Sequence, residues 1–280
     1  MRIAVIGASG FIGRHLVRGL EGRGDEAVPL SLRDPEAAGR ACDGADAVVN
    51  LAGEPVAQRW TDKVKERIRS SRVDDPRKLI AVFATLDAPP RAYISASAIG
   101  YYGTSETATF TEASSPGNDF LAEACIAWEA EAAKAAQGGR RVAIVRTGLV
   151  LGADGGALAR LLPIFKLGGG GHVASGNQWY SWIHIDDTVG IYLAAIDGVS
   201  GVLNATAPHP VRNRDFTSAL ARAVKRPAFF PIPEFTMNLA FGEGAVVVTK
   251  GQRVLPERTS AQGYTFRYPG IDAAFADIVG

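Results

Sequence analysis

The chain has 280 residues, enough for one large α/β domain or for a domain with a smaller lobe attached. Its 30 Lys and Arg residues are balanced by 29 Asp and Glu residues, so it lacks the basic charge excess typical of nucleic-acid binding. Its only two cysteines, Cys42 and Cys125, are too few for a disulfide framework or a thiolate metal site. No apolar run is long enough to cross a membrane, and a strand pattern already begins at Arg2. We therefore expect a cytoplasmic protein with neither a nucleic-acid nor a membrane partner.

Short β-branched runs alternate with longer amphipathic stretches through the first two hundred residues, which predicts a parallel sheet with crossover helices. Asp34 and Pro35 are typical of the N-cap and first position of a short helix. We expect strands at residues 3–6, 27–32, 47–51, 92–95 and 142–146, and longer helices at 11–21, 60–69, 76–85 and 119–136.

The first expected strand runs directly into "GASGFIG", residues 7–13, which in turn opens the first expected helix. Gly7 permits a tight turn, Gly10 lets the backbone approach a pyrophosphate, and Gly13 lets the helix pack closely on the strand. The positive end of the helix then faces the phosphates. The stretch predicts dinucleotide binding, against the alternative of an ordinary glycine-rich turn.

The end of the second strand selects between the two nicotinamide dinucleotides, because an acidic residue there would bind the ribose 2′-hydroxyl of NAD. Leu32 occupies that position, whereas Arg33 and Arg14 could pair with a 2′-phosphate. We therefore expect NADP(H) rather than NAD(H). The alternative is that Arg33 is only a solvated loop residue and that Asp34 binds the ribose.

The third expected strand ends in the small residues of "NLAGE", which suit a sheet edge covered by a flat ring, and we place Asp46 near the adenine. Thr147 and Gly148 follow the strand expected to lend backbone to the carboxamide. The predicted cofactor residues are Gly7, Ser9, Gly10, Phe11, Ile12, Gly13, Arg14, Arg33, Asp46, Leu51, Ala52, Gly53, Thr147 and Gly148.

The pattern changes after residue 151, where clustered glycines predict a loop-rich stretch. A strand and a helix then return in "SWIHIDDTVGIYLAAI", and a further strand is expected at "GVLNATA", residues 201–207. Further helices are expected at 215–224 and 271–279. We predict a nucleotide-binding domain of residues 1–151 and 182–207, and a smaller substrate lobe of residues 152–181 and 208–280. Gln178, Trp179 and Arg253 are the candidates to line a substrate cavity.

Three motifs in chain order resemble the extended short-chain dehydrogenase/reductases: the glycine stretch, "ISASAIGYYG" from Ile94 and "WIHIDD" from Trp182. "NLAGE", Ser71-Arg72, "RTGLVLG", "SGNQ" and "QRVLPERTSAQGYTF" resemble an atypical NAD(P)-dependent epimerase branch with its own C-terminal domain. The resemblance covers essentially the whole chain. It implies an α/β fold, a doubly wound Rossmann-like parallel sheet with a smaller C-terminal substrate lobe.

The wider family implies catalysis by a Ser, a Tyr and a Lys four residues after that Tyr. Ser97 matches the serine, but "GNDFLAEACIAWEAE" lacks the other two, and none of the seven tyrosines has Lys four residues later. Tyr101 and Tyr102 could still donate a proton beside Ser97, and we select Ser97 and Tyr101 as candidate catalytic residues. A phenol without a partnered Lys stays protonated, which favours carbonyl reduction over alcohol oxidation.

His184 and Asp186 lie two residues apart, but no third ligand has suitable spacing, so we expect no metal. In the resembling family Asp186 and Asp187 cap the following helix. Glu129 is expected to be structural or solvated rather than catalytic.

Two functions remain open: an oxidoreductase or epimerase acting on a small polar carbonyl or sugar-type substrate, and a non-catalytic NADP(H)-sensing module acting through a protein partner. The missing Tyr and Lys favour the second, and relatives of this branch are linked to cell division. The resemblance also implies a homodimer formed through two helices, here at about 60–85 and 119–136.

Overall fold

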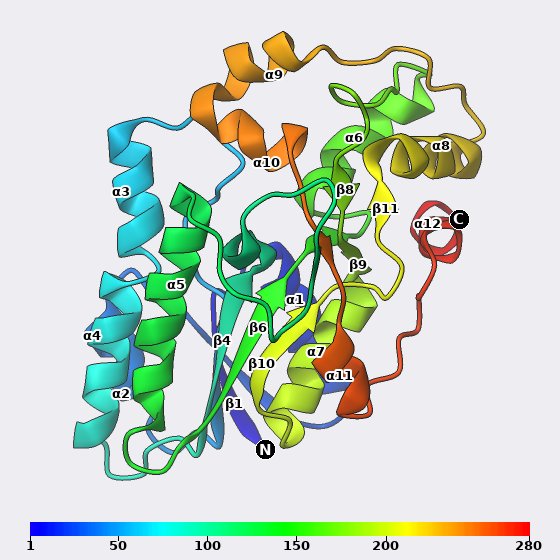
Figure 1. The fold of residues 1–280 in the computed structure, drawn as a ribbon. Helices are drawn as coiled ribbons and strands as arrows, with labels where there is room; N and C mark the ends of the chain where they lie inside the picture. Colours follow the sequence, from blue (N-terminus) through cyan, green and yellow to red (C-terminus); the bar gives the residue numbers. More distant parts are fainter.

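The computed structural model describes residues 1–280 and contains a central six-stranded parallel sheet (Figure 1). The strand order is β2-β1-β3-β4-β6-β10. The chain therefore moves outward from β1 to β2 and then continues on the other side of β1, which places the topological switch point between β1 and β3. The six strands are β1 (Arg2–Ile6), β2 (Glu26–Leu30), β3 (Ala47–Asn50), β4 (Ala92–Ala98), β6 (Arg141–Thr147) and β10 (Gly201–Ala205).

Helices cover both faces of this sheet, as crossover connections require. One face packs against α1 (Phe11–Gly22) and α7 (Ile185–Asp197), and the other against α2 (Pro35–Ala41), α4 (Asp74–Val82) and α5 (Phe120–Ala133) (Figure 1). The two apolar clusters between sheet and helices confirm the expected doubly wound architecture. α3 (Asp62–Ser70) precedes α4 and packs through Val64 and Ile68.

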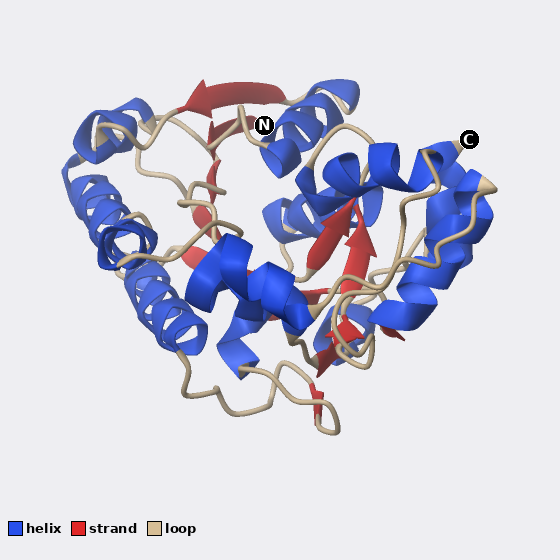
Figure 2. Cartoon of the chain, turned by 90° about the horizontal axis from the view of Figure 1, so that it is seen from above, coloured by secondary structure: helices blue, strands red, loops and turns tan.

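A third apolar cluster forms the core of the smaller lobe, which lies beyond the carboxyl ends of the strands (Figure 1). Figure 2 looks down on this end, where helices and loops lie over the strands. The lobe's helices are α6 (Gly156–Lys166), α8 (Asn213–Val224), α9 (Glu234–Phe241), α10 (Val246–Thr249) and α12 (Ile271–Val279), whereas α11 (Glu257–Ala261) lies lower, beside β10 and α7 (Figure 1).

Three two-stranded pairings connect segments that are far apart in the sequence. They are β5 (Thr109–Phe110) with β12 (Arg253–Val254), β7 (Leu149–Leu151) with β9 (Trp182–His184), and β8 (Trp179–Tyr180) with β11 (Val211–Arg212). No helix is both long enough and apolar enough to pass through a bilayer.

Two local expectations are wrong. The stretch after residue 151 is not all loop, because residues 156–166 form α6 and bury Leu158, Leu162 and Phe165. Asp186 and Asp187 do not cap α7; instead the His184 side chain accepts a hydrogen bond from the Asp186 N–H at 3.1 Å. The expected cap of α2 is confirmed, with the Asp34 carboxylate accepting from the Ala37 N–H at 2.9 Å.

Candidate cofactor and active site

The stretch from Gly7 to Gly13 forms a tight loop between β1 and α1 in which side chains would not fit. Gly7 has φ +82°, and a Cβ on Gly13 would lie 2.2 Å from the Gly7 carbonyl oxygen. α1 begins after Gly10, which has no side chain to cap it, and its first turn contains no acidic residue. Its first N–H groups are therefore available to an anion, and this geometry fits a pyrophosphate.

The residues after β2 differ in what they contact. Leu32 packs on the apolar cluster between the sheet and α2, so it has no polar group to offer a ribose. Asp34 already caps α2 through one carboxylate oxygen. Arg33 is exposed and takes part in no ion pair, whereas Arg14 is paired with Asp154. Arg33 is thus the free cation at this strand end.

The end of β3 is shaped by a buried asparagine. The Asn50 side chain accepts from the Ala52 N–H at 3.1 Å and donates to the Tyr93 hydroxyl at 3.0 Å, which sets the course of the chain after the strand. A Cβ on Gly53 would lie 3.2 Å from the Arg72 guanidinium, which itself donates to the Glu54 carbonyl. "NLAGE" and Ser71-Arg72 therefore form one contact region.

The other predicted cofactor residues divide between the two edges of the sheet. Thr147 ends β6 at the same carboxyl edge as the glycine loop, and a Cβ on Gly148 would lie 2.2 Å from the Ser181 carbonyl oxygen. Asp46 precedes β3 at the opposite, amino edge, where its carboxylate accepts from the Arg2 N–H at 2.8 Å. The expected adenine contact of Asp46 is therefore wrong, because Asp46 and the glycine loop lie at opposite edges of the sheet.

Ser97 lies at the carboxyl edge, within a buried polar cluster built on the α5 face of the sheet. Its hydroxyl donates to Glu129 Oε1 at 2.7 Å, and Glu129 accepts two bonds from Arg146, at 2.8 Å from Nε and 2.7 Å from Nη2. Arg146 Nη1 also donates to the Tyr102 hydroxyl at 3.0 Å, which in turn donates to Asn204 Oδ1 at 2.7 Å. The Ser97 proton is therefore engaged by a carboxylate rather than directed at an open site.

The two adjacent tyrosines have different surroundings. Tyr102 is 3% exposed, and burial raises the pKa of its phenol even though Arg146 opposes that shift, so it remains protonated. Tyr101 is only partly buried, and its ring centre lies 3.3 Å from the Arg146 guanidinium carbon. No protein group hydrogen-bonds the Tyr101 hydroxyl, so its proton is available to a substrate.

The face of α5 next to the end of β4 carries an apolar side chain and a thiol. A Cβ placed on Gly100 would lie 3.3 Å from Leu121 Cβ and 3.9 Å from Cys125 Sγ, so these two residues, four apart, face the end of β4. Burial raises the pKa of the Cys125 thiol to about 11. Neither residue supplies a charge or a proton acceptor at neutral pH.

His184 and Asp187 make structural contacts. Asp187 accepts from the Arg267 and Tyr268 N–H groups, at 2.7 and 2.9 Å, and holds the carboxyl-terminal segment against α7. No group of three or more His, Cys, Asp or Glu residues is arranged to hold a metal ion.

In the smaller lobe, two arginines flank one indole ring. The guanidinium carbons of Arg212 and Arg253 lie 3.8 and 5.4 Å from the Trp179 ring centre, and neither arginine has an ion-pair partner. Gln178 is 2% exposed and donates to two backbone carbonyls, so it holds the lobe together rather than lining a cavity.

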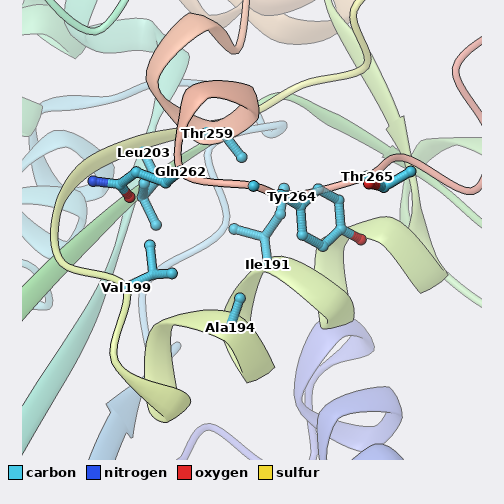
Figure 3. Close-up of a pocket in the computed structure, with 9 residues that line it drawn as sticks. Ile191, Ala194, Val199, Leu203, Thr259, Gln262, Tyr264 and Thr265 are labelled. Carbon is cyan, nitrogen blue, oxygen red and sulfur yellow. The ribbon is translucent and has the colours of Figure 1, made fainter.

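A pocket of about 260 Å³ lies between α7 and the segment that follows α11 (Figure 3). Its polar groups are already used: the Thr259 hydroxyl donates to the Asn204 carbonyl, and the Tyr264 hydroxyl bonds Asp187. None of its lining residues belongs to the glycine loop or to the cluster around Ser97. We therefore do not assign chemistry to this pocket.

Sequence reasoning missed Asn50, Arg146 and Asp154, and it named Arg72 only as part of the resemblance, without its contact to "NLAGE". Arg146 carried a usable signal, because a charged residue inside a buried strand needs a partner of opposite charge. Glu129, the partner, was noted but not connected with it.

Comparison with known proteins agrees with this geometry. Residues 3–205 match the NAD dependent epimerase/dehydratase family, and residues 232–278 match DUF1731, a domain of unknown function. "Epimerase family protein SDR39U1 homolog, chloroplastic" from Arabidopsis thaliana is 40% identical over 302 residues, spanning 100% of this chain and 87% of that protein. "Epimerase family protein YfhF" from Bacillus subtilis is 35% identical over 298 residues, spanning 100% and 98%.

Solved structures give the same result. The crystal structure of human epimerase family protein SDR39U1 with NADPH superposes with a TM-score of 0.93 at 35% identity, covering 100% of this chain and 99% of that one. A nucleoside-diphosphate sugar epimerase from Corynebacterium glutamicum superposes with a TM-score of 0.81 at 35% identity, covering 100% and 58%. The chain belongs to the NAD dependent epimerase/dehydratase family and ends in a DUF1731 domain.

Proposed function

We propose that this protein is an NADP(H)-dependent oxidoreductase or epimerase that acts on a small polar carbonyl or sugar-type substrate. The observation that carries the proposal is that two features lie at the carboxyl edge of the sheet. One is the uncapped start of α1, and the other is the Tyr101 phenol stacked on the buried guanidinium of Arg146. The human relative solved with NADPH supports a nicotinamide cofactor.

Backbone groups would hold most of the dinucleotide. The pyrophosphate would bind the loop from Gly7 to Gly13, while Ala52, Gly53 and the turn at Thr147 offer close backbone approach. A bound nicotinamide supplies or accepts a hydride. The exposed, unpaired Arg33 would bind the 2′-phosphate.

Replacing Arg33 with Asp tests the cofactor preference. We expect Arg33→Asp to weaken NADPH binding by about 10-fold or more and NADH binding by much less, because a charge-assisted bond to phosphate is lost. Titration calorimetry with both nucleotides measures this. Arg91→Asp is the matched control, since Arg91 is exposed and lies at the amino edge of the sheet. Equal losses for the two nucleotides would show that Arg33 does not discriminate between them.

For catalysis, we assign Tyr101 as the proton donor. Arg146 lies under its ring and is held by Glu129, so the ring orientation is set before a substrate binds. Ser97, predicted to polarise the substrate oxygen, instead anchors Glu129. Because no base is positioned beside Tyr101, reduction is the favoured direction.

The substrate lobe supports a polar or anionic substrate. Arg212 and Arg253 flank Trp179 without a carboxylate partner, a combination suited to carboxylate or phosphate next to a flat or apolar group. Their present hydrogen bonds are to neutral acceptors, the Asn177 and Glu106 carbonyls and the Thr109 hydroxyl, which an anion would have to replace in part. The Corynebacterium relative, named a nucleoside-diphosphate sugar epimerase, is consistent with this class.

Incubation with NADPH deuterated at its transferable position and a metabolite extract tests the reaction. Mass spectrometry should find protein-dependent deuterium in a small molecule, and Tyr101→Phe should lower that transfer by about 10²- to 10⁴-fold. Tyr264→Phe, a tyrosine outside the site, should not. Full transfer by Tyr101→Phe would remove Tyr101 from the mechanism.

The second candidate is the NADP(H)-sensing module. Leu121 and Cys125 favour it, because these two residues, four apart, face the end of β4 from the stretch in which the family's Tyr and Lys are expected. Confirmed NADPH binding with no label transferred to any metabolite would support this candidate. The expected homodimer stays a prediction.

A further inference from the structure

One carboxylate from a distant part of the chain lies among the basic residues of α1. Asp154 accepts a hydrogen bond from His15 Nε2 at 2.9 Å, and its carboxylate lies 3.5 Å from Arg14 Nη2 and 3.7 Å from Arg18 Nη2. Asp154 is separated from these residues by more than 130 positions in the sequence. The hydrogen bond from His15 lowers the pKa of Asp154, so its negative charge is present at neutral pH.

This carboxylate is held in place by packing. The ring of Phe11, the first residue of α1, lies against the glycines on both sides of Asp154: a Cβ on Gly152 would lie 2.7 Å from that ring, and a Cβ on Gly155 only 2.2 Å. Any side chain there would displace the loop. The position of Asp154 beside α1 is therefore a built feature rather than the chance position of a surface residue.

Arg14 connects this carboxylate with the glycine loop. Its Nη1 donates to the Ser9 carbonyl at 3.4 Å while its Nη2 donates to the Asp154 carbonyl at 3.2 Å. Charges this close interact at ordinary ionic strength, where the screening length is about 10 Å. A 2′-phosphate that pairs with Arg33 and Arg14, as the sequence predicts, would therefore compete with Asp154 for Arg14.

We propose that Asp154 is a specificity-determining residue of the cofactor site, which restrains Arg14 and thereby reduces the preference for the 2′-phosphorylated dinucleotide. This inference rests on the proposed NADP(H) binding. The 2′-phosphate adds about two negative charges, so the field of Asp154 opposes NADPH more strongly than NADH. Discrimination then depends on two opposing groups, Arg33 favouring the phosphate and Asp154 limiting the contribution of Arg14.

A double-mutant cycle on the full chain tests this assignment. Dissociation constants for NADPH and NADH are measured for the wild-type protein, Asp154→Asn, Arg14→Ala and the double variant. We expect Asp154→Asn to tighten NADPH binding by about 3- to 10-fold and NADH binding by less than about 2-fold, as suits a partly exposed charge. In the Arg14→Ala background the same change should leave NADPH binding unaltered.

Two further variants separate charge from folding. Asp154→Ser also removes the charge and should increase the ratio of the dissociation constants for NADH and NADPH, as Asp154→Asn does. Asp154→Glu keeps the charge and should leave this ratio unchanged. The inference is overturned if Asp154→Asn and Asp154→Ser leave the preference for NADPH over NADH unchanged or reduce it. It is also overturned if Asp154→Asn tightens NADPH binding in the Arg14→Ala background. If the wild-type protein binds neither nucleotide, the proposed function itself fails, which is a different result.

Discussion

Arg146 places a guanidinium inside the protein, at the centre of the buried polar cluster that includes Ser97, Glu129 and Tyr102. Burial by itself would lower its pKa, but the hydrogen bonds that Arg146 donates to Glu129 and Tyr102, with the charge of Glu129, outweigh burial and raise the pKa. Arg146 and Glu129 are 3% and 9% exposed, so each depends on the other for charge compensation. The pair also orients Ser97 and both tyrosines, which makes it the structural centre of the candidate site.

Replacing Glu129 with Gln should lower the free energy of unfolding by about 3–5 kcal/mol, because Arg146 would be left buried without a counter-charge. Urea denaturation followed by circular dichroism measures the change. Glu123→Gln is the matched control, since Glu123 lies on the same helix, is exposed and forms no ion pair. Glu123→Gln should lower the free energy of unfolding by less than about 1 kcal/mol. If Glu129→Gln lowers the free energy of unfolding by an equally small amount, then solvent rather than Glu129 compensates the charge of Arg146.

Single residues were predictable from the sequence where backbone geometry dictates their identity. Gly7 and Gly13 stand where a Cβ would strain or block the loop, so their spacing alone locates the loop. The partner of Ser97 was not predictable, because Glu129 lies 32 residues away on a separate helix. Asp46 was misplaced because a residue near a strand in the sequence can lie at either edge of the sheet.

At the scale of the element, α6 shows why composition misleads. Pro163 lies inside the helix and glycines flank it, so propensity argues against a helix there. Leu158, Leu162 and Phe165 nevertheless repeat with helical spacing and bury one face in the smaller lobe. Tertiary packing outweighs local propensity in this segment, and the spacing of the three apolar residues was the signal that could have found it.

The central sheet was predictable in outline because its strands are short apolar runs, several of them β-branched, between helices. Such an alternation has few folding solutions, and the right-handed crossover rule selects one of them. How the carboxyl-terminal segment attaches was not predictable, because its contacts are long-range: Asp187 binds backbone groups about 80 residues further along the chain. Contacts of this kind depend on the folded arrangement rather than on local sequence.

His184 joins three parts of the molecule. It caps α7, its ring centre lies 4.0 Å from that of Tyr268, and its Nε2 lies 3.3 Å from Asp277 on α12. Capping requires an unprotonated Nδ1, because that nitrogen accepts the Asp186 N–H. Burial lowers the pKa of His184, although Asp186, Asp277 and Asp187 oppose this shift.

The folded protein therefore holds His184 neutral, while the unfolded chain gains a proton near pH 6.5. The stability from neutral His184 is present above that pH and is lost as the pH falls below it, because the unfolded state then binds more protons.

We expect the free energy of unfolding to fall on acidification from pH 7, with a contribution from this site of at most about 1.4 kcal/mol per pH unit. Asn can replace the cap without titrating, so His184→Asn should flatten this part of the pH profile measured by urea denaturation, whereas His209→Asn, at an exposed position, should leave it unchanged. An unaltered slope in His184→Asn would assign the acid sensitivity to other groups and leave His184 with a packing role alone.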